Sequence, residues 1–246
     1  MGQRALDNSP MFQVAEMASR IFSPHDLNPL DNNPLLPILT ETVDFESLAA
    51  SPIKLFITAT NVRTGSGRVF RNAEITPRVL MASACLPTLF KAVEIDGESY
   101  WDGGYSGNPT MTPLVRERDS QDTMLMQINP VERSCIPRSA RDIMIRLNEV
   151  SFNAPLLKEL RMRSLLQQAA DPGTGEGAKW AHMRVHRIAT ERVPELKSSS
   201  KLITEWRFLC GLRDEGRRTA GLFMEAHGGN LGKRSTLDLD ALLDAP

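Results

Sequence analysis

The run from Ser99 to Pro109 constrains this chain more than any other, because it places one carboxylate inside a glycine-rich turn. Asp102 is followed directly by Gly103 and Gly104, and aromatic residues flank this tripeptide on both sides. Glycine lets other backbone approach closely, so this composition favours a carboxylate exposed at the end of a strand. Asp-Gly pairs also shape turns that carry no function, and on local sequence this alternative stays open.

Two hairpins are predicted around this turn. Residues 54–60 form a β-branched and aromatic strand, and we expect residues 69–71 to pair with it. Residues 92–95 and 99–101 predict a second hairpin around Asp-Gly-Glu, which delivers Asp102 at its exit.

A helix is predicted between the two hairpins. Thr76 is expected to cap its amino terminus, and Pro77 suits the first helical position. The helix carries Val79, Leu80 and Ala84, and we expect it to end at Pro87.

In this order, the segments resemble the patatin-like phospholipases, and most closely a bacterial branch of that family. The resemblance depends on Ala-Thr-Asn at 59–61, Ala-Ser-Ala-Cys-Leu-Pro at 82–87 and the Asp102-Gly103-Gly104 motif, and it covers the chain from about residue 22 to about residue 216. It implies an α/β fold, a partial three-layer α/β/α domain that lacks its amino-terminal strands and has a helical carboxy-terminal extension. It also implies that Asp102 is the base of a Ser-Asp dyad that hydrolyses lipid acyl esters without a cofactor.

The nucleophilic half of such a dyad is missing from the sequence. A nucleophile elbow needs Gly-x-Ser-x-Gly, which does not occur here. Ser66 has glycines on both sides but at the wrong spacing, so we interpret it as a hairpin tip. Ser83 could act as the nucleophile only if the fold differed from the one that the resemblance implies. The resembled family carries the elbow and its oxyanion loop upstream, so we expect the chain to begin inside the domain and to be inactive alone. Met1 is compatible with a true start and with an internal methionine.

Two functions remain open. One is a lipid acyl hydrolase of which this chain carries the aspartate half; the other is a non-catalytic lipid-binding or scaffold remnant. Phe90, Tyr100, Trp101 and Tyr105 are candidates to line an acyl-chain groove, and core packing is their alternative.

No metal or cofactor site is predicted. The histidines at 25, 182, 186 and 227 form no His-Glu-x-x-His pattern, and we expect His182 and His186 at the surface of a strand. The cysteines at 85, 135 and 210 are too few and too widely spaced for a zinc site or a disulfide framework.

Composition limits the partners. The net charge of -1 and the pI near 6.4 give no general attraction to nucleic acid. The sequence contains neither a secretory signal nor an apolar run long enough to span a bilayer. We therefore expect a cytoplasmic or peripheral membrane protein that meets a lipid or fatty-acyl ester substrate, with upstream targeting sequence and oligomeric state left open.

The sequence predicts four parts. Residues 1–50 form a helical and loop lead-in with a helix over residues 12–22, residues 51–130 form the core with the Asp-Gly-Gly motif, residues 131–226 are helical, and residues 227–246 form a mobile tail.

Further strands and helices follow from the apolar pattern. We expect residues 54–57 and 124–128 to lie in one sheet with helices on both faces. Pro155 should break the helix of residues 139–168 in two, residues 183–188 alternate as a strand, and residues 201–223 form a closing helix.

Overall fold

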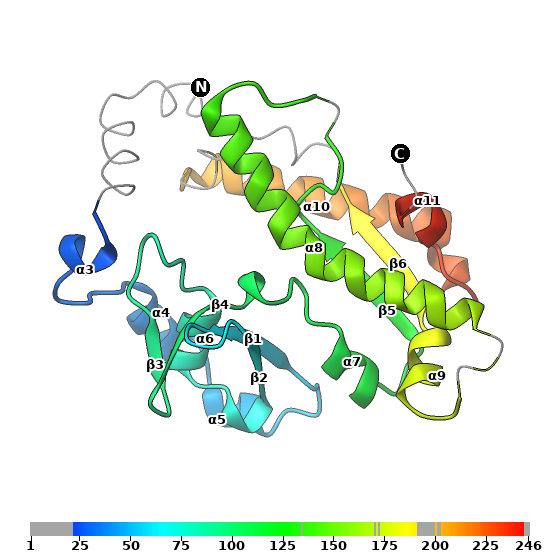
Figure 1. Cartoon of the computed structure of the whole chain (residues 1–246), viewed down its shortest axis with the longest axis horizontal. Helices are drawn as coiled ribbons and strands as arrows, with labels where there is room; N and C mark the ends of the chain where they lie inside the picture. The colour runs from blue at the N-terminus through cyan, green and yellow to red at the C-terminus, as the bar shows by residue number, and fades with distance from the viewer. Residues whose placement is uncertain are drawn as a thin grey trace. The chain divides into compact units, whose positions relative to one another are not determined.

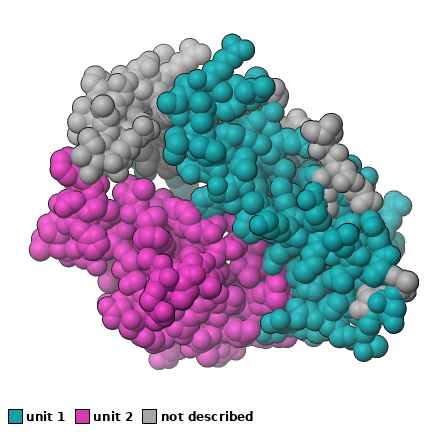
Figure 2. Space-filling model, in the orientation of Figure 1, with its two compact units in different colours: residues 1–7, 114–246 teal, residues 8–113 magenta. Residues whose placement is uncertain are grey.

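A computed structural model describes residues 22–133, 135–169, 171, 173–190, 200 and 203–243. The described chain divides into two compact units, of which unit 2 runs to Pro113 and unit 1 begins at Leu114 (Figure 2). The helix expected over residues 12–22 lies outside the described residues, apart from Phe22. The four-part division of the chain stays a prediction.

Unit 2 is built on a four-stranded sheet in the order β2-β1-β4-β3, and all three strand pairs are antiparallel (Figure 1). Its strands are β1 (Phe56–Asn61), β2 (Gly67–Arg71), β3 (Val93–Ile95) and β4 (Glu98–Asp102). Ile57 lies opposite Phe70, and Glu94 lies opposite Ser99. Both predicted hairpins are therefore confirmed.

The helices of unit 2 are short. They are α3 (Pro24–Leu27), α4 (Leu35–Thr42), α5 (Phe45–Ala49), η1 (Asn72–Glu74), α6 (Pro77–Ser83) and η2 (Gly103–Tyr105). Thr76 caps α6 as predicted, because its side chain accepts a hydrogen bond from the backbone N–H of Val79. The helix ends at Ser83, before the proline that was expected to stop it.

The core of unit 2 lies where α6 covers the sheet. Phe70 and Tyr100 meet edge to face, with ring centroids 5.9 Å apart, and both side chains are buried. Val79 and Ala82 of α6 pack into the same cluster. Helix and sheet are thus joined by one apolar interface, which includes Tyr100, two residues before Asp102.

Unit 1 contains a separate two-stranded parallel sheet of β5 (Asp122–Gln127) and β6 (Arg184–Ala189). The prediction that residues 54–57 and 124–128 share one sheet is wrong. β5 pairs with β6 along its whole length, from Asp122 to Gln127, in a sheet that shares no strand with that of β1.

The helices of unit 1 include two long ones. Helix α7 (Thr112–Glu117) precedes β5 and begins in the last two residues of unit 2. The others are α8 (Ala140–Gln168), α9 (Glu176–Ala181), α10 (Trp206–His227), η5 (Gly228–Asn230) and α11 (Leu239–Leu243). None of the helices in the described part of the chain is long and apolar enough to cross a membrane.

Helix α8 is continuous through Pro155, so the predicted break is wrong. A proline costs one backbone hydrogen bond, but its φ angle suits a helix. Buried residues on both sides, Asn153 and Leu156, hold the helix in place through packing. The side chains of Asn153 and Arg163 donate to the backbone oxygens of Pro130 and Met183, so α8 follows the sheet from its carboxyl end to its amino end.

The segment after His227, expected as a mobile tail, carries η5 and α11. The backbone N–H groups of Thr236 and Leu237 donate to the oxygen of Val185 in β6, and Leu239 is buried. The polar composition does not reveal these contacts, because two of the hydrogen bonds are made by backbone N–H groups.

Candidate active site

Asp102 is the last residue of β4 and is held through its backbone from two sides. Its N–H donates to the oxygen of Cys85 at 2.9 Å, and its carbonyl accepts from the hydroxyl of Thr60 at 2.8 Å. Ala59 of β1 lies directly opposite it. The predicted position, on a turn at the end of a strand, is confirmed.

The carboxylate of Asp102 is only partly engaged. Its Oδ1 accepts a hydrogen bond from the N–H of Gly104 at 2.8 Å, which fixes the side chain over the start of η2. Its Oδ2 has no hydrogen-bond partner among the described residues, and the side chain is partly exposed. One oxygen is therefore aimed while the other remains available to accept a proton.

Gly103 is fixed by the neighbouring strand. A Cβ at this position would lie 2.0 Å from the backbone oxygen of Thr58 and 2.6 Å from its carbonyl carbon. Glycine is needed here because no side chain fits against the backbone of β1. This close approach sets the direction in which the chain leaves Asp102.

The hydroxyl groups of Thr60 and Ser106 support the turn through hydrogen bonds. Ser106 donates through Oγ to the backbone oxygen of Gly103 at 3.1 Å, and the Oγ1 of Thr60 lies 3.0 Å from Ser106 Oγ. The backbone N–H of Ser106 donates to the same oxygen of Gly103. Ser106 is thus a structural support of the motif.

The two other serines considered from the sequence lie in ordinary structural positions. Ser66 belongs to the exposed tip between β1 and β2, where Gly65 has a φ of 71°. Ser83 ends α6, and its hydroxyl donates to the backbone oxygen of Leu80 at 2.9 Å. Neither serine lies on a strand-to-helix elbow.

The charge of Asp102 reaches two neighbouring ionisable side chains. Burial raises the pKa of the Cys85 thiol to about 11, and the negative charge of Asp102 adds to this effect. Burial also raises the pKa of Tyr105, again with a contribution from Asp102. Both groups are therefore neutral at physiological pH, and neither competes with Asp102 as a base.

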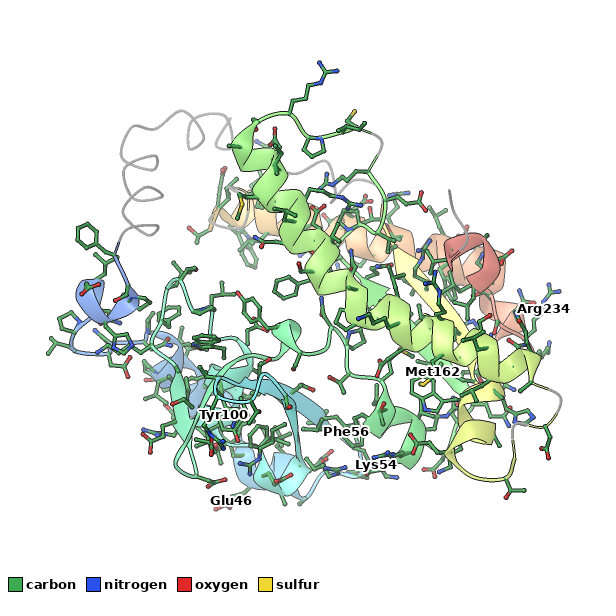
Figure 3. The ribbon with its side chains drawn as sticks, in the orientation of Figure 1. Glu46, Lys54, Phe56, Tyr100, Met162 and Arg234 are labelled. Atoms are coloured by element: carbon green, nitrogen blue, oxygen red, sulfur yellow. The ribbon has the colours of Figure 1, made fainter. Side chains whose placement is uncertain are left out.

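The four aromatic candidates for a groove differ in position. Tyr100, labelled in Figure 3, is only 3% exposed and belongs to the core between α6 and the sheet, which supports the core alternative for this residue. Phe90 and Trp101 are partly buried, and Tyr105 is 47% exposed. A groove lined by Phe90, Trp101 and Tyr105 stays a prediction.

The histidines take different places from those expected. His182 is exposed, whereas His186 is fully buried, so the expectation of a surface position is wrong for His186. Its Nε2 lies 2.9 Å from Oδ1 of Asp122, and its Nδ1 lies 2.9 Å from the hydroxyl of Thr236. These polar partners explain how a histidine can be buried. No group of His, Cys, Asp or Glu in the described ranges is arranged to hold a metal ion.

The network around Asp122 was not predicted from the sequence. Arg184 donates to both carboxylate oxygens of Asp122 at 2.9 Å, and the N–H of Gly232 donates to Oδ1 at 3.1 Å. This network joins β5, β6 and the carboxy-terminal segment. The only signal in the sequence is an acid at the start of one strand and Arg-x-His at the start of another, a pattern that does not reveal which strands pair.

The sheet, the capping helix α6 and the strand-end carboxylate define an α/β domain with a candidate acid-base residue. The family model of the patatin-like phospholipases matches residues 13–115, which include β1, α6 and the Asp102 turn. No curated protein matches the chain.

Proposed function

We propose that this chain supplies the base of a patatin-like acyl hydrolase that acts on lipid acyl esters. Asp102 is the base in this proposal, and the nucleophilic serine comes from a Gly-x-Ser-x-Gly elbow outside the present sequence. The main support for the proposal is the geometry of the Asp102 carboxylate. One oxygen is oriented by Gly104, the other has no partner among the described residues, and the residue lies within the region that matches the family model.

The chemistry needs no cofactor. The Oδ2 of Asp102 accepts the hydroxyl proton as the serine oxygen attacks the ester carbonyl, and the alcohol leaves with that proton as the acyl-serine forms. Asp102 then accepts a proton from the water that attacks the acyl-serine. It returns this proton to the serine oxygen as the ester bond breaks and the fatty acid leaves. Backbone N–H groups beside the elbow would stabilise the oxyanion of both steps.

The backbone of the turn supports this role. Asp102 is anchored by Cys85, Thr60 and Gly104, so its side chain can be aimed with little loss of conformational entropy on binding. Cys85 and Tyr105 stay protonated beside it. We further propose that the protein contacts the membrane peripherally, where its lipid substrate lies.

The second candidate function is a lipid-binding or scaffold remnant without chemistry. It is favoured by the sequence, which contains no Gly-x-Ser-x-Gly. The two candidates predict the same inactivity for the isolated chain, so that result alone does not separate them.

The test compares the isolated chain with a longer form in which a segment carrying the elbow precedes residue 1. The isolated chain should neither react with a fluorophosphonate probe nor release fatty acid from phospholipid vesicles. The longer form should do both. Labelling of the isolated chain at Ser66 or Ser83 would contradict the dyad, and a longer form that binds vesicles without hydrolysing them would favour the remnant.

A further inference from the structure

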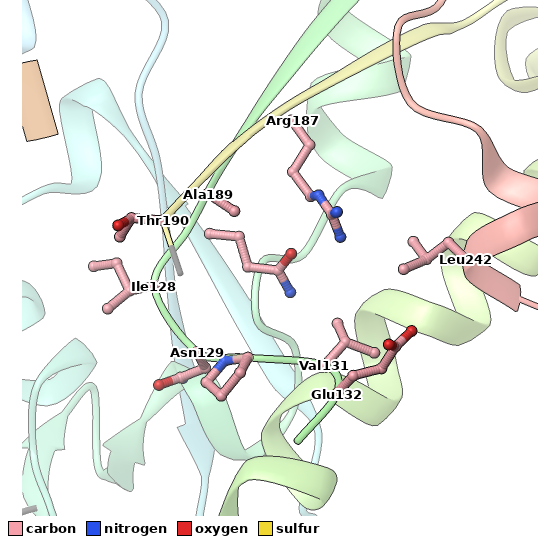
Figure 4. Close-up of a pocket in the computed structure, with 10 residues that line it drawn as sticks. Ile128, Asn129, Val131, Glu132, Arg187, Ala189, Thr190 and Leu242 are labelled. Atoms are coloured by element: carbon pink, nitrogen blue, oxygen red, sulfur yellow. The ribbon is translucent and has the colours of Figure 1, made fainter. Parts of the chain in front are cut away.

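Unit 1 contains a pocket of about 240 Å³ at the carboxyl ends of β5 and β6 (Figure 4). The strand ends, the loop after β5 and Leu242 of α11 line it. In parallel sheets, ligands commonly bind beyond the carboxyl ends of the strands. The pocket lies in a different unit from Asp102, and none of the residues proposed for the dyad lines it.

The strand register brings two hydrogen-bond donors to one face of this sheet. Leu125 lies opposite Arg187, and Gln127 lies opposite Ala189. Because side chains alternate along a strand, Gln127 and Arg187 are on the same face of the sheet. They are diagonal neighbours on adjacent strands, offset by two residues. Both line the pocket.

Neither donor has a partner among the residues that the structure describes. The Nε2 atom of Gln127 is buried and has no hydrogen-bond partner within the described residues. The guanidinium of Arg187 makes neither a hydrogen bond nor an ion pair with any residue that the structure describes, although the side chain is partly buried. A buried donor without a partner costs free energy, so the amide of Gln127 indicates an acceptor that binds here, and Arg187 offers a second donor beside it.

The opposite wall is held in place before any ligand binds. Arg146 of α8 donates to the backbone oxygen of Val131 at 2.8 Å, and Asn153 donates to that of Pro130 at 2.8 Å. Glu149 forms ion pairs with both Arg133 and Arg146. The loop is thus fixed along α8, which lowers the cost of binding.

The other residues that line the pocket restrict the size, polarity and charge of a ligand. Val131, Ala189 and Leu242 give the pocket an apolar side, and the carboxylate of Glu132 projects from the loop toward the same hollow as Arg187 (Figure 4). The volume is below the roughly 300–1,000 Å³ of pockets for drug-sized ligands. An anion of a few carbon atoms fits these limits, and Glu132 disfavours a second negative charge.

We propose that this pocket binds a small aliphatic monocarboxylate. Arg187 binds the carboxylate as a bidentate donor, Gln127 donates from its Nε2, and the hydrocarbon chain lies against Val131 and Leu242. This site does not depend on the proposed hydrolase function.

The first test titrates hexanoate into the full chain and follows binding by calorimetry and by amide chemical shifts. We expect a dissociation constant of about 1 mM or tighter, with shifts centred on residues 127–132 and 187–190. Hexanol and hexylamine should bind at least about tenfold more weakly, because neither carries the anion. No saturable binding of hexanoate, or equal binding of hexanol, would overturn the proposal.

The second test changes the two donors. Arg187→Met should weaken hexanoate binding at least about tenfold, while the matched change Arg207→Met on the exposed start of α10 should leave it unchanged. Gln127→Met removes the unpaired amide, so it should weaken binding and raise the melting temperature together. Loss of folding in Arg187→Met would leave Gln127→Met to decide, and unchanged affinity in that folded variant would overturn the site.

The third test concerns the charge of Glu132. Adipate, which carries a second carboxylate, should bind more weakly than hexanoate, and Glu132→Gln should reduce this difference. Adipate that binds as tightly as hexanoate to the unchanged protein would contradict a site for monocarboxylates.

Discussion

The backbone oxygen of Thr58 lies where only a glycine can face it, 2.0 Å from the position of a Cβ at residue 103. This contact fixes the path of the chain immediately after Asp102. Strand β1 and the Asp-Gly-Gly turn therefore pack tightly together, and the strand sets the direction in which the chain leaves Asp102.

Gly103→Ala should therefore destabilise unit 2. The added methyl group has to displace backbone, which costs about 2–3 kcal/mol in the free energy of unfolding. Urea unfolding followed by circular dichroism measures this. Gly211→Ala on α10 is the control, since nothing lies within 4 Å of its Cβ and alanine favours the helix. A stability of Gly103→Ala equal to that of the unchanged protein would contradict the close contact.

Pro155→Ala should stabilise unit 1. Alanine restores the backbone N–H that can donate to the oxygen of Ser151 within α8, and the expected gain in the free energy of unfolding is about 1–3 kcal/mol. Urea unfolding of the two proteins gives the difference. A loss of stability would show that the proline ring makes packing contacts worth more than the hydrogen bond.

The Asp122 network should make unit 1 sensitive to acid. Hydrogen bonds from Arg184 hold the pKa of Asp122 below its ordinary value of 3.8, and those from His186 and Gly232 act in the same direction. A depressed pKa contributes stability that is complete above the pKa of the unfolded state and is lost as the pH falls through the folded-state value. Stability should fall from about pH 5 downward, and less steeply in Asp122→Asn. Parallel pH profiles of the two proteins would contradict this role.

Cys85 should report the charge of Asp102. Since burial and that charge raise the thiol pKa to about 11, Cys85 should resist alkylation in the folded protein while the exposed Cys135 reacts. In Asp102→Asn the pKa of Cys85 should fall, because one cause of its increase is removed. Mass spectrometry of the alkylated peptides over a pH series measures both effects, and a pKa of Cys85 that is the same in both proteins would argue against their proximity.

Local signals predicted unit 2 well. The Asp96-Gly97 turn has positive φ at both residues, as a tight hairpin of this composition requires, and the Thr76-Pro77 pair marks the start of α6. The motif residues Asp102 and Gly103 could be placed at the strand end for the same reason. Short-range chemistry determines each of these features.

Unit 1 was harder to predict, because its contacts join distant segments. The pairing of β5 with β6 links Asp122 to Arg184, and neither strand contains a signal for its partner. The burial of His186 depends on Asp122 and Thr236, which come from two other segments of the chain. The pocket donors Gln127 and Arg187 come together only through the same register.

The role of Asp102 as the base is measured in the longer form that contains the elbow. In this form we compare the steady-state hydrolysis of a phospholipid by the unchanged protein, by Asp102→Asn and by Asp96→Asn. The amide of Asp102→Asn keeps the shape of the side chain but cannot accept the serine proton, so turnover should fall by a factor on the order of 10⁴.

Asp96→Asn is the matched control, because Asp96 lies in an exposed hairpin turn of the same unit, where it forms an ion pair with Arg68. It should keep nearly full turnover, and the melting temperatures of all three proteins should agree closely. Full activity in a folded Asp102→Asn protein would show that Asp102 is not the base.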